Sequence, residues 1–268
     1  QNGETKAESL ELDGREYNLY RRYITKSMFP KKLIKYLVPN RVISDTAMQK
    51  LESMTGLMRV KKAIKGVERK IRMLGQSASY LYCYVGNPGV GKTTVAKLMG
   101  GILKATGALS QGHVITRTAR QMSENISEFD KIIKLAKNGI LFIDEAHQLA
   151  DSNYGRLVIK KLLTVLEDTN ITKNTCIILA GYPTDMEMLF ATDAGLASRF
   201  GTADSIIEFD DYTPTELLEI LDDMAKNAAS IVQIGTPYPI KLSEKFRELS
   251  LEVFKDITNN GNRDFGNA

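Results

Sequence analysis

The sequence predicts an α/β fold in which a parallel five-stranded sheet is flanked by helices and followed by a small helical lid. Three observations predict it. Apolar, strand-like runs alternate with helical segments between residues 80 and 209, which is typical of a parallel sheet with right-handed crossovers. The glycine-rich residues 86–93 separate the first of these runs from a helix. From Thr213 onward the pattern is wholly helical.

Before the sheet, two segments of opposite charge lead into two helices. Residues 1–16 are acidic and polar and are expected to be loosely ordered, whereas residues 17–40 are typical of a basic connector interrupted by Pro30 and Pro39. A helix is expected from Ser44, which with Asp45 offers a cap. A second helix is expected over residues 60–74, where apolar residues fall on one stripe. We therefore predict an N-terminal extension or linker over residues 1–43.

The core and the lid follow in order. The five expected strands are residues 80–85, 113–118, 140–144, 175–180 and 205–209. Thr213-Pro214-Thr215-Glu216 begins a helix, since proline suits its first position and an acid its first turn, and another helix is expected over residues 243–254. We place the α/β core at residues 44–212 and the lid at residues 213–268. Because the chain starts at Gln1, we expect it to be processed, cut or incompletely represented at its start.

The glycine-rich segment fits the phosphate-binding loop G-x-x-x-x-G-K-[ST] at every fixed position. Its glycines let backbone N–H groups converge on phosphate oxygens at the positive end of a helix. Lys92 is expected to reach the β- and γ-phosphates, and the Thr93 hydroxyl is expected to bind Mg²⁺. The expected phosphate-binding residues are Gly86, Asn87, Pro88, Gly89, Val90, Gly91, Lys92, Thr93 and Thr94.

Two acids close the third strand. Residues 140–143 are apolar and Asp144-Glu145 follow, which is typical of a central parallel strand with carboxylates at its C-terminal edge. Ligands bind at that edge in open α/β sheets. We expect Asp144 to hold the Mg²⁺ and its water shell, and Glu145 to polarise the attacking water. The cofactors predicted are ATP or ADP and Mg²⁺.

Composition is that of an ordinary globular chain, with 43% hydrophobic and 25% charged residues. No apolar run approaches the length of a membrane span, and no signal peptide is visible. Cys83 and Cys176 lie in apolar runs without metal-ligand spacing, so we expect buried, reduced thiols in a cytoplasmic compartment.

Positive charge gathers near the N-terminus. Residues 17–72 hold 15 Lys or Arg against 3 Asp or Glu, while the whole chain carries only +4. Aromatic residues are interleaved with the basic ones between Tyr17 and Arg41. This pattern suits a nucleic-acid contact or an acidic protein partner, and it suits equally a solvated helix face with anchoring aromatics.

Together these motifs resemble the AAA+ ATPases. Leu51-x-x-Met54-Thr55-Gly56-Leu57-x-x-Val60-Lys61 looks like the family's entry motif, in which the segment packs by the adenine. Leu179-Ala180-Gly181-Tyr182-Pro183 and Gly195-Leu196-Ala197-Ser198-Arg199-Phe200 are similar to the subfamily of CbbX, CfxQ and the sporulation stage V protein K, and Glu208-Phe209-Asp210-Asp211-Tyr212-Thr213 continues that match. The resemblance covers about residues 44–268.

The resemblance implies several further features. It implies a P-loop NTPase sheet of order 5-1-4-3-2, Met54 and Gly56 beside the base, and a ring, normally a hexamer, with ATP at the subunit interfaces. In such a ring, Arg199 would act as an arginine finger on the γ-phosphate of the neighbouring subunit.

The sequence departs from the family in three places. Ala180-Gly181-Tyr182 leaves no polar γ-phosphate sensor after the fourth strand. The pore-loop position, residues 121–125, lacks the aromatic and glycine of threading relatives, so only Met122 could grip a substrate chain there. The lid motif stops at Gly266-Asn267-Ala268, before its arginine, and Arg263 is out of register.

Asp144-Glu145-Ala146-His147 also spells the signature of one helicase class. The other motifs of those helicases do not appear, so His147 is interpreted as a first-turn helix residue and His113 as a surface or cap residue. Three functions remain: an ATP-hydrolysing motor that remodels or assembles a protein partner, a nucleic-acid-associated ATPase using residues 17–72, and a nucleotide-switched assembly platform that threads nothing.

Overall fold

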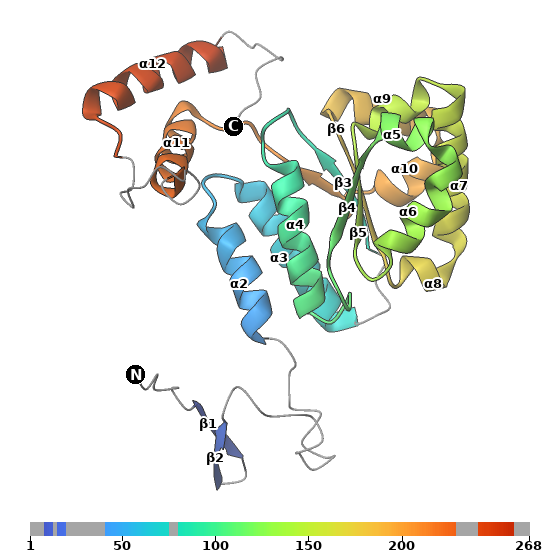
Figure 1. The fold of residues 1–268 in the computed structure, drawn as a ribbon, viewed down its shortest axis with the longest axis horizontal. Helices are drawn as coiled ribbons and strands as arrows, with labels where there is room; N and C mark the ends of the chain where they lie inside the picture. The colour runs from blue at the N-terminus through green and yellow to red at the C-terminus, as the bar shows by residue number, and fades with distance from the viewer. Residues whose placement is uncertain (1–7, 13–14, 20–40, 75–79, 229–240, 260–268) are drawn as a thin grey trace. The chain divides into compact units, whose positions relative to one another are not determined.

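The computed structural model describes residues 8–12, 15–19, 41–74, 80–228 and 241–259 of the 268-residue chain (Figure 1). The chain divides into two compact units, residues 1–39 and residues 40–268. The expected boundary between core and lid lies inside the second unit. Pro30, Pro39, Arg263 and the end of the lid motif lie outside the described residues.

The first unit holds a two-stranded antiparallel sheet of β1 (Glu8–Leu12) and β2 (Arg15–Leu19), with Leu12 opposite Arg15. The expectation of loose order for residues 1–16 is therefore wrong for the described strand residues. The missed signal is Asp13-Gly14 between two alternating runs, a dipeptide typical of two-residue hairpin connections.

The second unit is built around a parallel five-stranded sheet. Its spatial order is β4-β5-β6-β3-β7, which in chain order of the five strands is 2-3-4-1-5. This confirms the predicted order 5-1-4-3-2, read from the opposite edge. Every strand overlaps the run from which it was predicted, and the strands are β3 (Leu81–Val85), β4 (Val114–Thr118), β5 (Ile140–Asp144), β6 (Cys176–Gly181) and β7 (Ile206–Glu208).

Helices cover both faces of this sheet (Figure 1). One face carries α2 (Arg41–Ser53), α3 (Met58–Leu74) and α4 (Lys92–Ala105). The other face carries α5 (Ala119–Glu124), η3 (Ile126–Glu128), α6 (Phe129–Ala136), η4 (Ala146–Ala150), α7 (Asn153–Glu167), α8 (Thr169–Thr172), α9 (Pro183–Thr192) and α10 (Ala194–Phe200). The helical segment after the sheet comprises α11 (Pro214–Ala228) and α12 (Glu244–Asn259).

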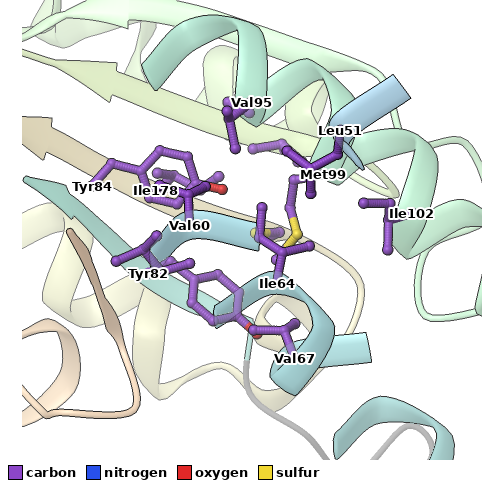
Figure 2. Packing of buried hydrophobic residues seen from close by; sticks show 14 of the residues in the cluster. Leu51, Val60, Ile64, Val67, Tyr82, Tyr84, Val95, Met99, Ile102 and Ile178 are labelled. Atoms are coloured by element: carbon purple, nitrogen blue, oxygen red, sulfur yellow. The ribbon is translucent and has the colours of Figure 1, made fainter. Parts of the chain in front are cut away.

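The sheet separates two apolar cores. Alternate residues of each central strand serve opposite faces, so Phe142 lies in one core and Ile143 in the other. Figure 2 shows the first core, where side chains of α2, α3 and α4 converge on strands β3 and β6. The stripe predicted for residues 60–74 lies against it, since Val60, Ile64 and Val67 are buried. Because both faces are covered, the three central strands β3, β5 and β6 are buried and largely apolar, whereas the edge strand β4 carries Thr116, Arg117 and Thr118.

Cys83 and Cys176 lie on the adjacent strands β3 and β6, but on opposite faces of the sheet. Both are buried free thiols. Burial raises the pKa of Cys83 from 9.0 to about 12 and raises the pKa of Cys176 as well. Among the described residues, no helix has the length and apolar character needed to cross a bilayer.

Candidate active site

The phosphate loop joins β3 to α4 and depends on glycine at two positions. Gly91 caps α4 with φ 92°, a left-handed backbone that glycine adopts without steric cost. Gly86 packs so closely that an added Cβ would lie 2.7 Å from Cβ of Phe209 and 2.8 Å from its carbonyl oxygen. The sheet edge thus supports the loop from behind, and the first turn of α4 points its free N–H groups toward the site.

Lys92 lies at the mouth of this loop. Its ammonium donates to the carbonyl oxygens of Gly86 at 2.8 Å and Asn87 at 2.7 Å. The nitrogen also lies 5.9 Å from the centre of the Tyr182 ring. Burial lowers the pKa of Lys92, while the carboxylates of Asp144, Glu145 and Asp211 act in the opposite direction. A cation is therefore held close to the carboxylates that end β5.

Glu145 follows Asp144 with a left-handed backbone, φ 52° and ψ 38°. For a residue other than glycine such a conformation costs about 1–3 kcal/mol and persists where neighbours enforce it. Its backbone N–H donates to Oδ1 of Asp144 at 3.1 Å. Its Oε2 lies 3.4 Å from the Gln148 amide nitrogen and 3.5 Å from Nε2 of His147. The turn directs two adjacent carboxylates toward one cleft.

That cleft has a volume of about 950 Å³ and opens between the phosphate loop and α11. The loop side supplies a lysine, hydroxyls and carboxylates, whereas α11 supplies mostly apolar side chains. The lining residues are Met54, Thr55, Pro88, Gly89, Gly91, Lys92, Thr93, Thr94, Asp144, Glu145, Tyr212, Ile220, Leu221, Asp223, Met224 and Ala225. One charged end and one apolar wall suit a molecule that has both phosphates and a flat ring.

The predicted adenine contacts lie at the apolar side. Met54 lines the cleft, and its carbonyl accepts a hydrogen bond from the Lys61 ammonium at 2.5 Å. Gly56 stands behind the lining with φ 64°, and an added Cβ would lie 2.7 Å from Oε1 of Glu216. Gly56 thus shapes the wall, and its direct contact with a base stays a prediction.

The donor set at the charged end fits Mg²⁺. Thr93 offers a hydroxyl and Asp144 a carboxylate, both at the cleft. Magnesium is usually held by one or two protein oxygens, with water and substrate phosphates completing the octahedron. The described part of the chain contains no cluster of three or more His, Cys, Asp or Glu that could hold a metal ion.

The segment after β7, which stands out in the sequence only through the family resemblance, fastens the phosphate loop. The Asn87 amide donates to both carboxylate oxygens of Asp211, at 2.9 and 2.8 Å. The Tyr212 hydroxyl donates to the carbonyl of Val90 at 3.3 Å. These partners are 124 and 122 residues apart, so no local pattern could have paired them.

Arg199 does not line the cleft of its own chain. It lies on α10 beside a second cavity of about 620 Å³, together with Lys70 and Asp204. Its guanidinium donates to the Gly195 carbonyl at 3.2 Å. This placement leaves Arg199 away from its own phosphate loop, and action on a neighbouring subunit stays a prediction.

The structure also changes the expectation for Met122. Met122 is fully buried in the second core, so the suggestion that it could grip a substrate chain is wrong. The capping box between Thr118 and Gln121 begins α5 and turns Met122 inward.

Four of the seven basic side chains of α3 form ion pairs. Arg59 pairs with Glu208 and Asp210, Lys70 with Asp204, and Arg72 with a glutamate one turn earlier. Acids from outside the segment therefore offset part of the positive charge of α3.

Known proteins resemble this chain. Residues 82–203 match the "ATPase family associated with various cellular activities (AAA)". The chain is 37% identical over 183 residues to a chloroplastic ribulose bisphosphate carboxylase/oxygenase activase of Cyanidioschyzon merolae, covering 62% of this chain and 61% of that protein. It is 34% identical over 170 residues to protein CbbX of Cereibacter sphaeroides, covering 60% and 53%.

The chain thus spans between half and two thirds of the length of these relatives. A solved RuvB mutant of Thermotoga maritima shares the fold with a TM-score of 0.51 and 24% identity, over 76% of this chain and 72% of that one. Family match, relatives, sheet order and phosphate loop agree, and the chain belongs to the AAA ATPases as a CbbX-like member.

Proposed function

We propose that this chain binds ATP with Mg²⁺, hydrolyses it, and uses the energy to remodel or assemble a protein partner. One observation carries the proposal: Lys92, Thr93, Asp144 and Glu145 all line the same cleft. The local sequence of each is compatible with other roles, but their convergence at one sheet edge suits a nucleoside triphosphate with a divalent cation.

Binding follows from the geometry of the loop. The phosphates would be held by backbone N–H groups at the start of α4 and by the Lys92 ammonium. Lys92 would then exchange its two contacts with loop carbonyls for contacts with phosphate oxygens. The apolar wall of α11 and Met54 would hold the base. Thr93 and Asp144 would hold Mg²⁺, which supplies charge neutralisation at the phosphate oxygens when bound.

Hydrolysis would use Glu145 as the group that orients water and accepts its proton. An oxygen–phosphorus bond to the γ-phosphate forms, the bond to the β-phosphate oxygen breaks, and ADP and phosphate leave.

Ring assembly would complete the site. Arg199 lies outside its own cleft, which is what an arginine acting on the next subunit requires. We therefore place the chain in a ring, with a hexamer as the expected size, in a reducing, cytoplasmic compartment where Cys83 and Cys176 stay thiols.

The partner proposed is a protein. The name of the activase relative states that it acts on another enzyme. We propose a partner of the same class, a protein, for this chain. The ion pairs of α3 weaken the case for the nucleic-acid alternative. Burial of Met122 favours a second candidate, a nucleotide-switched platform that changes partner assembly without threading a chain.

The test compares wild type with Glu145→Gln. We expect Mg²⁺-dependent ATP hydrolysis by wild type and strongly reduced turnover with retained ATP binding in the variant. The variant should then retain its protein partner in the presence of ATP, and partner capture from extract, identified by mass spectrometry, should depend on nucleotide. Turnover that is unchanged in Glu145→Gln would refute the role of this residue. A steep salt-dependent affinity for DNA or RNA would favour the nucleic-acid reading.

A further inference from the structure

His147 lies between two carboxylates from different parts of the fold. Its Nε2 is 3.5 Å from Oε2 of Glu145 and 3.8 Å from Oδ2 of Asp185 on α9. Glu145 directly follows strand β5 and caps η4, while Asp185 lies in the first turn of α9. One imidazole nitrogen thus faces both the proposed hydrolytic carboxylate and a second carboxylate beside it.

The imidazole is enclosed by neighbours that fix its orientation. The His147 side chain is only 15% exposed, and its ring lies 5.5 Å from the ring of Tyr182. An added Cβ at Gly181 would lie 3.0 Å from Nδ1, so the glycine there leaves just enough room for the ring. The histidine is therefore a packed part of the site and has little freedom to rotate away.

The surroundings also select the tautomer. Nδ1 is buried and has no hydrogen-bond partner in the described part of the chain. A proton on Nδ1 would be a buried, unsatisfied donor, which costs roughly 1–3 kcal/mol. A proton on Nε2 faces two carboxylate oxygens instead. The neutral ring should therefore carry its hydrogen on Nε2 and donate it toward Glu145 and Asp185.

We propose that His147 is a positioning residue that holds the Glu145 carboxylate in its working orientation by linking it to Asp185. The proposal rests on the hydrolytic function proposed above. Glu145 has a left-handed backbone, which persists only where its surroundings impose it. His147 and Gln148 approach the same oxygen, Oε2, and so leave the other oxygen of the carboxylate for water. Contacts of this length commonly shorten when substrate binds.

Three substitutions separate a donor at Nε2 from mere packing. His147→Gln keeps an N–H near the position of Nε2, whereas His147→Asn moves it to the position of Nδ1, and His147→Phe keeps a ring without any donor. We expect Phe and Asn to lower kcat by roughly 10–100-fold, the loss typical for a group that orients a catalytic ligand. KM and ATP affinity should stay within about twofold, since only the hydrolytic carboxylate is disturbed. Gln should recover kcat to within about threefold of wild type.

The chain supplies its own matched control. His113 is the other of its two histidines, also has a buried Nδ1 without a partner among the described residues, and places Nε2 2.7 Å from the Leu135 carbonyl. It does not line the cleft. His113→Gln should therefore leave kcat unchanged. In a Glu145→Gln background, His147→Phe should cause no further loss, because the group it positions is already gone.

A second measurement needs neither nucleotide nor activity. With only two histidines, ¹⁵N–¹H correlation spectra of the imidazoles can be assigned by comparison with His113→Gln. We expect the Nε2–H tautomer for His147, with shifts in its ring signals on Glu145→Gln and on Asp185→Asn, and no shift of His113 in either. An Nδ1–H tautomer, or ring signals indifferent to both carboxylates, would overturn the proposal.

The outcomes are distinguishable from failure of the proposed function. If wild type does not hydrolyse ATP, the proposed function fails, while the spectra still test the contact. If wild type hydrolyses ATP and His147→Phe keeps its kcat, the positioning role alone is refuted. If Gln and Phe lower kcat equally, the ring acts by packing and the proposal is likewise refuted.

Discussion

Replacing Gly86 by alanine tests whether the sheet edge supports the phosphate loop as tightly as the structure shows. The new Cβ would lie 2.7 Å from Cβ of Phe209 and 2.8 Å from its carbonyl oxygen. Apolar carbons normally approach to about 3.5–4.0 Å, so the overlap is close to 1 Å. Both obstructing atoms are fixed by the backbone and cannot rotate away. Overpacking of this kind typically costs about 1–3 kcal/mol.

A second glycine serves as a control, because its replacement by alanine should stabilise the protein instead of destabilising it. Gly66 lies within α3, and an added Cβ there would meet no atom within 4 Å. Because glycine lowers helix stability by about 0.5–1 kcal/mol relative to alanine, Gly66→Ala should stabilise the protein. For a chain of this size, 1 kcal/mol corresponds to roughly 2–4 °C in Tm. We therefore expect Gly86→Ala to lower Tm by about 2–12 °C and Gly66→Ala to raise it by about 1–4 °C.

Thermal unfolding followed by circular dichroism, without nucleotide, measures both shifts. Fluorescent ATP binding should in addition be about tenfold weaker for Gly86→Ala, or roughly 1.4 kcal/mol, because the loop must move to admit the methyl group. A Gly86→Ala protein with wild-type Tm and ATP affinity would show that Phe209 does not hold the loop. The close approach of Gly86 to Phe209 would then contribute to neither stability nor ATP binding.

Three further predictions follow from the site and the core. Lys92→Ala should abolish ATP binding in equilibrium titrations, and affinity kept within about threefold, roughly 0.7 kcal/mol, would contradict the phosphate-loop role. Arg199→Ala should keep ATP affinity but lower hydrolysis, and mixing it with wild type should reduce the rate below a straight line against mutant fraction; a straight line would mean that no site is shared. Cys83 should resist thiol reagents in the folded protein, since burial raises its pKa from 9.0 to about 12. The unfolded thiol ionises first, so its contribution to stability is complete below about pH 9 and is lost as pH rises toward 12, which urea unfolding at pH 8 and pH 10.5 can detect.

Local patterns predicted the strands well because the three central ones, β3, β5 and β6, are apolar on both faces. Phosphate-loop spacing likewise identified Lys92, and the end of an apolar strand identified Asp144. Both depend on neighbours in sequence, and the structure places both at one cleft. The sheet order came from the resemblance, because no local pattern records which parallel strands are adjacent.

Contacts between distant segments could not be predicted, because they leave no local pattern in the sequence. The sequence around His147 is that of an ordinary first-turn residue. No local pattern indicates its contact with Asp185, which lies 38 positions later. Met122 appeared to be available to substrate, since a capping box decides only in three dimensions which side chain turns inward. The paired strands of residues 8–12 and 15–19 are a different case: the sequence contains a turn signal between them, and the acidic composition around it does not prevent strand pairing.

One short segment fixes how the loop and the helical wall of the cleft relate. Phe209 packs behind Gly86, Asp211 accepts from the loop amide, and Tyr212 donates to a loop carbonyl. Two residues after Tyr212, α11 begins at Pro214, held by a capping box in which Thr213 and Glu216 exchange hydrogen bonds. The chain between loop and helix is thus too short and too well bonded to absorb a displacement. We therefore expect a displacement of the loop to move α11, and with it the apolar wall of the cleft. Because this connection lies within one chain, it needs no neighbouring subunit, in contrast to the action proposed for Arg199.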